Sequence, residues 1–257
     1  MSKFDRLSVY AVLLASGLAL FACRGRQTKD KYTDTATSGF ISISADESFR
    51  RIVQQEIDVF ESIYTMAGID PIYASEVDAI NLLLKDSVRL TVSTRRLTDA
   101  EKAGLEEKKF FPKEFKVASD AIALIVNRQN PDSIISLKDL SRILTGEVTE
   151  WSELYPGSKL GKLQLVFDNP NSSTVRYAID SICRGRPLAG SLHAQKSNAE
   201  VIDFVSQSPS AIGVIGVSWV GSESDSTNLS FSDRVTVMAV SREEKATEQN
   251  SYKPFQA

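Results

Sequence analysis

The chain has 257 residues, a formal net charge of −3 and 25% charged residues. No long run of Lys or Arg follows the first residues, so the chain lacks the basic surface of a nucleic-acid-binding protein. One histidine, two cysteines and the lack of an Asp-rich loop of the EF-hand type lead us to expect no metal and no cofactor.

The first 23 residues have the order of a signal peptide, with Lys3 and Arg6 before an apolar run over residues 7–22. That run is shorter than the roughly 20 residues of a membrane-spanning helix. It ends in Leu-Phe-Ala-Cys, which resembles a bacterial lipobox, so we expect a leader over residues 1–22 and acylation of Cys23. An ordinary cleaved leader with an incidental Cys23 is the alternative.

Polar residues follow Cys23, and residues 23–38 form the lipidated cysteine and a predicted tether. Residues 24–38 contain no aliphatic side chain larger than alanine, so they cannot bury enough apolar surface to fold. The folded part is expected to begin at residue 39.

Strand and helix patterns then alternate along the chain. Residues 40–44 predict a strand, and residues 47–64 predict a helix with its apolar side chains on one face. Residues 88–92 predict the next strand. Thr98 and Glu101 have the spacing of a capping box at the start of a helix.

The second half of the pattern continues in the same way. Residues 121–126 predict a buried strand, and a helix is expected to start at Ser136 and stop at Gly146. Further strands are predicted over 163–167, 211–217 and 235–240, with one helix from 175 to 182 and another that opens at Ser197. Cys183 is expected to be a small buried residue. The alternation predicts an α/β fold with largely parallel pairing.

Polar loops follow several of the predicted strands, where open α/β sheets bind their ligands. Hydroxyls and unpaired amides at a helix N-terminus suit an anion with several oxygens, and Arg95 adds a guanidinium. The candidate ligand-binding residues are Glu47, Ser48, Ser93, Thr94, Arg95, Asp168, Ser172, Ser173 and Thr174. The alternative for each loop is ordinary capping or surface pairing, since Ser, Thr and Asp are favoured helix N-caps.

Five segments in this order resemble the phosphate-binding proteins of phosphate ABC importers, in the type II periplasmic-binding-protein superfamily. They are RLTVSTRRLT at 89–98, ASDAIALIVN at 118–127, ILTG at 143–146 with WSEL at 151–154, SST at 172–174 and AIG at 211–213. The resemblance implies a two-lobed fold of mixed sheets flanked by helices, with a hinge between the lobes and phosphate held between them. It assigns residues 39–121 and 236–257 to lobe 1 and residues 122–235 to lobe 2.

The leader pattern predicts an exported, lipid-anchored protein of the bacterial envelope that faces the periplasm. The resemblance implies a monomer that meets ABC permease subunits. It implies no catalytic residue, and the sole histidine, His193, stands in no recognisable catalytic motif. We therefore expect a binding protein that captures phosphate or a related oxyanion, and not an enzyme.

Three departures from the family pattern matter. Ser173 replaces a glycine of the phosphate loop, and Asp168 stands where the family has an arginine. The first loop is acidic, and fixed carboxylates repel a phosphate dianion. The chain also stops without the closing segments that return to lobe 1, so we expect a truncated chain; a natural end with a smaller lobe 1 is the alternative. The acidic residues keep open a second function, an envelope sensor or scaffold whose site has degenerated.

Overall fold

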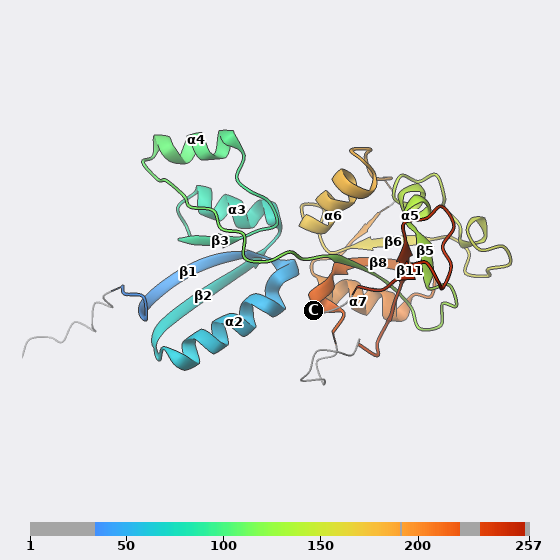
Figure 1. Cartoon of the computed structure of the whole chain (residues 1–257), viewed down its shortest axis with the longest axis horizontal. Helices are drawn as coiled ribbons and strands as arrows, with labels where there is room; N and C mark the ends of the chain where they lie inside the picture. The colour runs from blue at the N-terminus through green and yellow to red at the C-terminus, as the bar shows by residue number, and fades with distance from the viewer. Residues whose placement is uncertain (1–33, 191, 222–231, 255–257) are drawn as a thin grey trace, which may run out of the picture.

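The computed structural model describes residues 34–190, 192–221 and 232–254, which form two lobes (Figure 1). The predicted leader, Cys23 and most of the predicted tether lie outside these residues. Within the described ranges, no helix combines the length and the apolar character needed to cross a bilayer.

Lobe 1 is a parallel three-stranded sheet with helices on both sides (Figure 1). Its elements are β1 (Ser38–Asp46), the short 3-10 helix η1 (Glu47–Phe49), α2 (Arg50–Ile63), β2 (Met66–Ala74), α3 (Glu76–Leu84), β3 (Leu90–Val92) and α4 (Asp99–Glu107). The strand order is β2-β1-β3, and both pairings are parallel. The carboxyl ends of the three strands therefore meet at one edge of the sheet.

Lobe 2 contains a five-stranded mixed sheet and a small three-stranded sheet. Its elements up to residue 182 are β4 (Ile122–Val126), β5 (Ile134–Ser136), α5 (Leu137–Leu144), η2 (Trp151–Glu153), β6 (Gln164–Phe167), α6 (Ser173–Tyr177) and the π-helical turn η3 (Ala178–Ile182). They are followed by β7 (His193–Ala194), α7 (Asn198–Gln207), β8 (Ala211–Gly216), η4 (Val217–Trp219), β9 (Thr236–Val237), β10 (Ala239–Ser241) and β11 (Ser251–Tyr252). The larger sheet has the order β7-β6-β8-β4-β9, and the smaller has the order β11-β10-β5.

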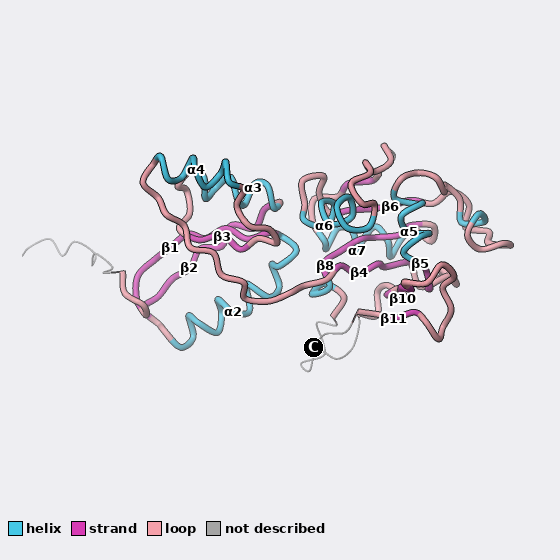
Figure 2. The backbone as a smooth tube through the Cα atoms, turned by 45° about the horizontal axis from the view of Figure 1, so that its top comes forward, coloured by secondary structure: helices cyan, strands magenta, loops and turns pink. Residues whose placement is uncertain are grey.

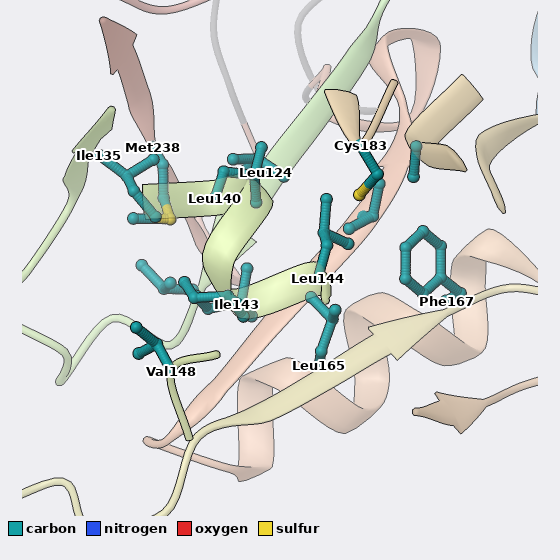
Figure 3. Close-up of a cluster of buried hydrophobic side chains, with 14 of the residues drawn as sticks. Leu124, Ile135, Leu140, Ile143, Leu144, Val148, Leu165, Phe167, Cys183 and Met238 are labelled. Carbon is teal, nitrogen blue, oxygen red and sulfur yellow. The ribbon is translucent and has the colours of Figure 1, made fainter. Parts of the chain in front are cut away.

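The larger sheet of lobe 2 is buried on both faces, because successive side chains of a strand point to opposite sides. On β4, Leu124 and Val126 join one apolar cluster, and Ala123 and Ile125 join the other. Figure 3 shows the first cluster, in which Cys183 lies among apolar side chains. Cys183 is fully buried, as the sequence predicts.

The larger sheet of lobe 2 contains both parallel and antiparallel strand pairs, whereas the alternating pattern predicts largely parallel pairing. Strand β6 is parallel to β7 and β8, but β4 is antiparallel to both β8 and β9. The reason is that β4 enters lobe 2 directly from lobe 1, through the extended segment at 110–121 (Figure 2). The carboxyl ends of β6 and β8 therefore lie at the edge where β4 begins.

Two expectations about residues 235–257 need correction. Residues 235–240 do not form one strand, because β9 pairs with β4 whereas β10 pairs with β5. The lobe assignment of residues 236–257 to lobe 1 also fails for the described part, since all these pairings are within lobe 2. Val237 and Met238 complete the two apolar clusters there.

The apolar face predicted for residues 47–64 is only partly buried. The helix is divided into η1 and α2, and Ile57 is buried, but Ile52 and Ile63 are 45% and 63% exposed. Strand β2 and helix α3 complete lobe 1, and neither is predicted from the sequence.

Candidate functional site

The carboxyl ends of the lobe 1 strands and the carboxyl ends of β6 and β8 in lobe 2 meet where the lobes contact each other. Ser48 Oγ of lobe 1 lies 3.4 Å from Ser173 Oγ of lobe 2. The main-chain oxygen of Ser48 accepts hydrogen bonds from Trp219 Nε1, at 3.0 Å, and Ser218 Oγ, at 3.1 Å. The loops predicted to bind a ligand after β1 and β6 are thus brought together.

The lobe 1 side of this contact is built by the turn after β1. Asp46 caps η1, and its Oδ1 accepts a hydrogen bond from the Ser48 amide at 2.9 Å. Asp46, Glu47 and Ser48 are 0%, 8% and 2% exposed. Charged residues are seldom buried so deeply unless they have partners.

On the lobe 2 side, the loop after β6 folds back on its own hydroxyls. Ser172 caps α6, and its Oγ accepts from the Val175 amide at 3.3 Å. Thr174 Oγ1 donates to Asp168 Oδ1 at 2.6 Å and lies 2.8 Å from Ser172 Oγ. The predicted residues Asp168, Ser172 and Thr174 therefore form one buried network.

Asn198 joins the acidic residues of the two lobes. It is the first residue of α7, it is fully buried, and its Nδ2 donates to Glu47 Oε2 at 2.6 Å. The same amide nitrogen lies 3.3 Å from Asp168 Oδ2, and the Asn198 main-chain N–H donates to Glu47 Oε2 at 3.1 Å. Its Oδ1 accepts from the Gly216 amide at 2.9 Å, which fixes the orientation of the side chain.

Burial raises the pKa values of three carboxyl groups at this contact. It is the largest cause for Asp46, Glu47 and Asp168, and the charge of Asp168 further raises the pKa values of the other two. Hydrogen bonds from Ser173, Asn198 and the loop hydroxyls act in the opposite direction. Asp46 Oδ2 and Glu47 Oε1 have no hydrogen-bond partner.

A second polar group joins the lobes beside the first. Arg176 of α6 forms an ion pair with Glu76 of α3, and its Nη2 donates to Thr94 Oγ1 at 2.6 Å. Thr94 in turn donates to Glu76. The predicted residue Thr94 is therefore at the lobe contact, with two partners that are not predicted from the sequence.

The structure places Arg95 and Ser93 in contacts within lobe 1. Two nitrogens of Arg95 donate to the two carboxylate oxygens of Glu101, at 2.8 and 2.7 Å. Ser93 Oγ donates to the Arg95 main-chain oxygen at 2.7 Å. The guanidinium of Arg95, a candidate ligand-binding group, is thus paired with a neighbouring carboxylate.

The residues that were missed carried weak sequence signals. Asn198 follows the predicted N-cap Ser197, and Arg176 lies two residues after the ligand loop, so both stand at helix starts that the sequence marks. Glu76 belongs to a helix that was not predicted. Only the tertiary contact between the lobes distinguishes these residues from ordinary helix residues.

The acidic residues of the contact are not arranged for a metal ion. Among the residues that the structure describes, no three His, Cys, Asp or Glu side chains are grouped so as to hold one. The arrangement instead offers buried hydroxyls, amide N–H groups and carboxylates, which bind ligands through hydrogen bonds and charge.

The chain is similar to curated phosphate-binding proteins. It is 24% identical over 199 residues to the phosphate-binding protein PstS of Pseudomonas aeruginosa PAO1, covering 72% of this chain and 61% of that protein. With PstS of Bacillus subtilis 168 the identity is 26% over 226 residues, covering 82% of this chain and 71% of that protein. The chain thus spans about three fifths of the length of the Pseudomonas relative.

The fold is shared with a solved structure from Clostridium perfringens, described as a phosphate ABC transporter substrate-binding protein with bound phosphate. The TM-score is 0.65 at 22% identity, over 79% of this chain and 76% of that one. A family model described as a PBP superfamily domain matches residues 30–257. The chain therefore belongs to the PBP superfamily, and its fold is that of the type II periplasmic binding proteins.

Proposed function

We propose that this protein captures inorganic phosphate, or a related oxyanion, between its two lobes and delivers it to the permease subunits of an ABC importer. The observation that carries the proposal is the buried set of hydroxyls from both lobes, with Ser48 Oγ 3.4 Å from Ser173 Oγ. The names of the Pseudomonas and Bacillus relatives support phosphate as the ligand.

The chemistry of the contact suits a small ligand with several oxygens. Hydroxyls of Ser48, Ser172, Ser173 and Thr174 are buried there and can donate to such a ligand. The N-terminus of α7 adds main-chain N–H groups and the positive end of a helix. These groups bind and orient an anion, and they provide no nucleophile with its base, so we propose a binding role and not an enzymatic one.

The proposed location follows from the sequence. Acylation at Cys23 would tether a monomer to the bacterial envelope, and residues 23–38 would let it face the periplasm. The support for this location is the leader pattern in the sequence. Of residues 23–38, the structure describes only 34–38. A fatty-acid label that is present on the wild type and absent from Cys23→Ser would support it, and an unlabelled wild type would remove it.

One observation favours a second candidate, an envelope sensor or scaffold with a degenerated site. Thr174 and Asn198, which could donate to a ligand, donate instead to Asp168 and Glu47. If the protein retains these contacts permanently, the lobes do not accept a solute.

Titration of the purified chain with phosphate, sulfate and molybdate separates the two candidates. Trp219 fluorescence is a suitable signal, because its indole nitrogen donates across the lobe contact to Ser48. A hydrogen bond to a charged oxygen contributes about 1.5–3 kcal/mol, so Ser172→Ala is expected to weaken binding about tenfold to a hundredfold. Ser152→Ala, on an exposed turn of lobe 2, is the matched control. A folded protein that binds none of the three oxyanions would favour the sensor or scaffold.

A further inference from the structure

The N-terminus of α7 is occupied by a carboxylate from the other lobe. Glu47 Oε2 accepts two hydrogen bonds from Asn198, one from the main-chain N–H at 3.1 Å and one from Nδ2 at 2.6 Å. The first N–H groups of a helix have no partner within the helix, and its positive end attracts anions. Glu47 thus binds where an anionic solute would be expected to bind.

Glu47 reaches this position across the lobe contact. It follows β1 in lobe 1, whereas α7 packs against β8 and β4 in lobe 2. Its side chain is mostly buried, so the contact excludes water from the carboxylate. A charge-assisted hydrogen bond in such surroundings is stronger than one at the surface.

The amide of Asn198 is held ready for an anion. Because its Oδ1 accepts from the Gly216 amide, Nδ2 must point toward the carboxylates. The helix Asn198–Gln207 has ten residues, and Ser197 caps it through the Glu200 amide, which leaves the Asn198 N–H for Glu47. Both donors are oriented by lobe 2 alone, so another anion can take the place of Glu47 without rearranging them.

The carboxylate of Glu47 is held less firmly than one in a fully compensated ion pair. Its ion-pair partner is Arg50, whose Nε lies 3.8 Å from Oε1 and whose side chain is 49% exposed. Glu47 Oε1 accepts no hydrogen bond, and the charge of Asp168 acts against ionisation of Glu47. Such a contact can hold two lobes together and can still be displaced by a better ligand.

We propose that Glu47 is an internal ligand: its carboxylate binds the N-terminus of α7 and draws the lobes together without a solute. The closing role does not depend on the identity of the solute. Its consequence, that an oxyanion must displace Glu47 to bind, rests on the proposed function.

The test measures the distance between the lobes in the purified chain. Fluorophores are attached through Lys85→Cys in lobe 1 and Lys159→Cys in lobe 2, two exposed positions, in a chain that also carries Cys23→Ser, while the buried Cys183 remains unlabelled. Without added oxyanion, Glu47→Ala is expected to lengthen the mean distance, and Glu47→Gln, which retains the size and loses the charge, to lengthen it less. Glu56→Ala, an exposed glutamate of α2, is the control and is expected to match the parent.

Inorganic phosphate is then titrated into the same proteins. If Glu47 keeps nine tenths of the molecules closed, its removal makes phosphate bind about tenfold more tightly. An unchanged distance in both Glu47→Ala and Glu47→Gln, with both proteins folded, would overturn the proposal. A longer distance in Glu47→Ala with no phosphate binding in any variant would support the closing role and would remove phosphate as the solute.

Discussion

The carboxylate of Glu76 and the guanidinium of Arg176 form an ion pair between the lobes, with 2.6 Å between Oε2 and Nε. A second hydrogen bond, from Arg176 Nη2 to Glu76 Oε1 at 3.2 Å, makes the pair bidentate. Burial acts to raise the pKa of Glu76, but hydrogen bonds from Arg176 and Thr94 bring it below its usual value. Glu76 is therefore a buried carboxylate that depends on lobe 2 for its charge partner.

Removing the partner of this buried carboxylate is expected to destabilise the protein. Arg176→Ala should lower the free energy of unfolding by about 1–3 kcal/mol, because Glu76 loses donors that water cannot easily replace. Arg234→Ala, in an exposed pair with Asp203, should lower it by no more than about 1 kcal/mol. Chemical denaturation measures both, and equal effects would show that the pair between the lobes is no stronger than a surface pair.

The pair of Arg95 and Glu101 predicts an acid-sensitive contribution to stability. Hydrogen bonds, chiefly from Arg95 and in smaller part from Thr98, lower the pKa of Glu101 from 4.5 to about 2. A carboxyl whose pKa is lowered by folding stabilises the protein above its unfolded pKa, and this contribution is lost as the pH falls toward the folded value. We expect Glu101→Gln to be less stable than the wild type at pH 6, with the difference shrinking between pH 4.5 and about 2. Unfolding free energies across that range measure it, and a constant difference would contradict the assignment.

The buried carboxyl group of Asp46 is expected to make a contribution to stability that falls as the pH rises. Folding raises its pKa above 3.8, chiefly by burial, so the native state binds its proton more tightly than the unfolded state does. The contribution of Asp46 to stability should therefore fall as the pH rises from 3.8 through the raised pKa. Asn keeps the cap and carries no charge, so Asp46→Asn should be about 1–3 kcal/mol more stable than the wild type at pH 8. The difference should be smaller at pH 4, and thermal unfolding at the two pH values measures this. A difference of the same size at both values would exclude titration of Asp46 as its cause.

Many features of the fold could be predicted because they depend on neighbouring residues. Thr98 and Glu101 form the capping box that their spacing indicates, and Ser136 caps α5. Gly146 has a φ of +78°, which suits the turn after that helix. The assignment of residues 236–257 failed because it depended on which lobe the apolar side chains pack against, and local patterns do not carry that information.

The candidate site was predictable only in part, because local sequence patterns do not show which residues of the two lobes come into contact. The loops after β1 and β6 could be found because polar residues at strand ends mark the ligand edge of an α/β sheet. Asn198 and Arg176 gain their significance from Glu47 and Glu76, which lie more than 90 residues away in the sequence and in the other lobe. A charged residue such as Arg95 also cannot be assigned to a ligand from sequence, because a neighbouring carboxylate competes for it.

The surroundings of two glycines, Gly213 in the larger sheet of lobe 2 and Gly104 in α4, predict opposite effects of an alanine substitution on stability. A Cβ at Gly213 of β8 would lie 2.8 Å from carbon atoms of Ile125 and Val201, so Gly213→Ala should destabilise the protein by about 1–3 kcal/mol. A Cβ at Gly104 of α4 would meet no atom within 4 Å, so Gly104→Ala should stabilise it by about 0.5–1 kcal/mol. Denaturation midpoints measure both, and a neutral Gly213→Ala would mean that β8 packs less tightly than the structure shows.

Asp168 predicts how phosphate affinity changes with pH. Its ionised carboxylate repels a phosphate anion and engages Thr174, so Asp168→Asn should bind phosphate more tightly than the wild type at pH 8.5. Burial raises the pKa of Asp168, so part of the repulsion is lost as the pH falls, and the two affinities should converge toward pH 5.5. Asp168→Arg should tighten binding further and raise the association rate at low salt.

Ser172→Ala is the control, because it removes a hydroxyl that does not titrate and should weaken binding by a similar factor at every pH. Calorimetry across pH 5.5–8.5 measures all four proteins. If Asp168→Asn instead weakens binding, and wild-type binding fades as phosphate loses its proton, then Asp168 accepts a hydrogen bond from the monoprotonated ligand and does not repel it.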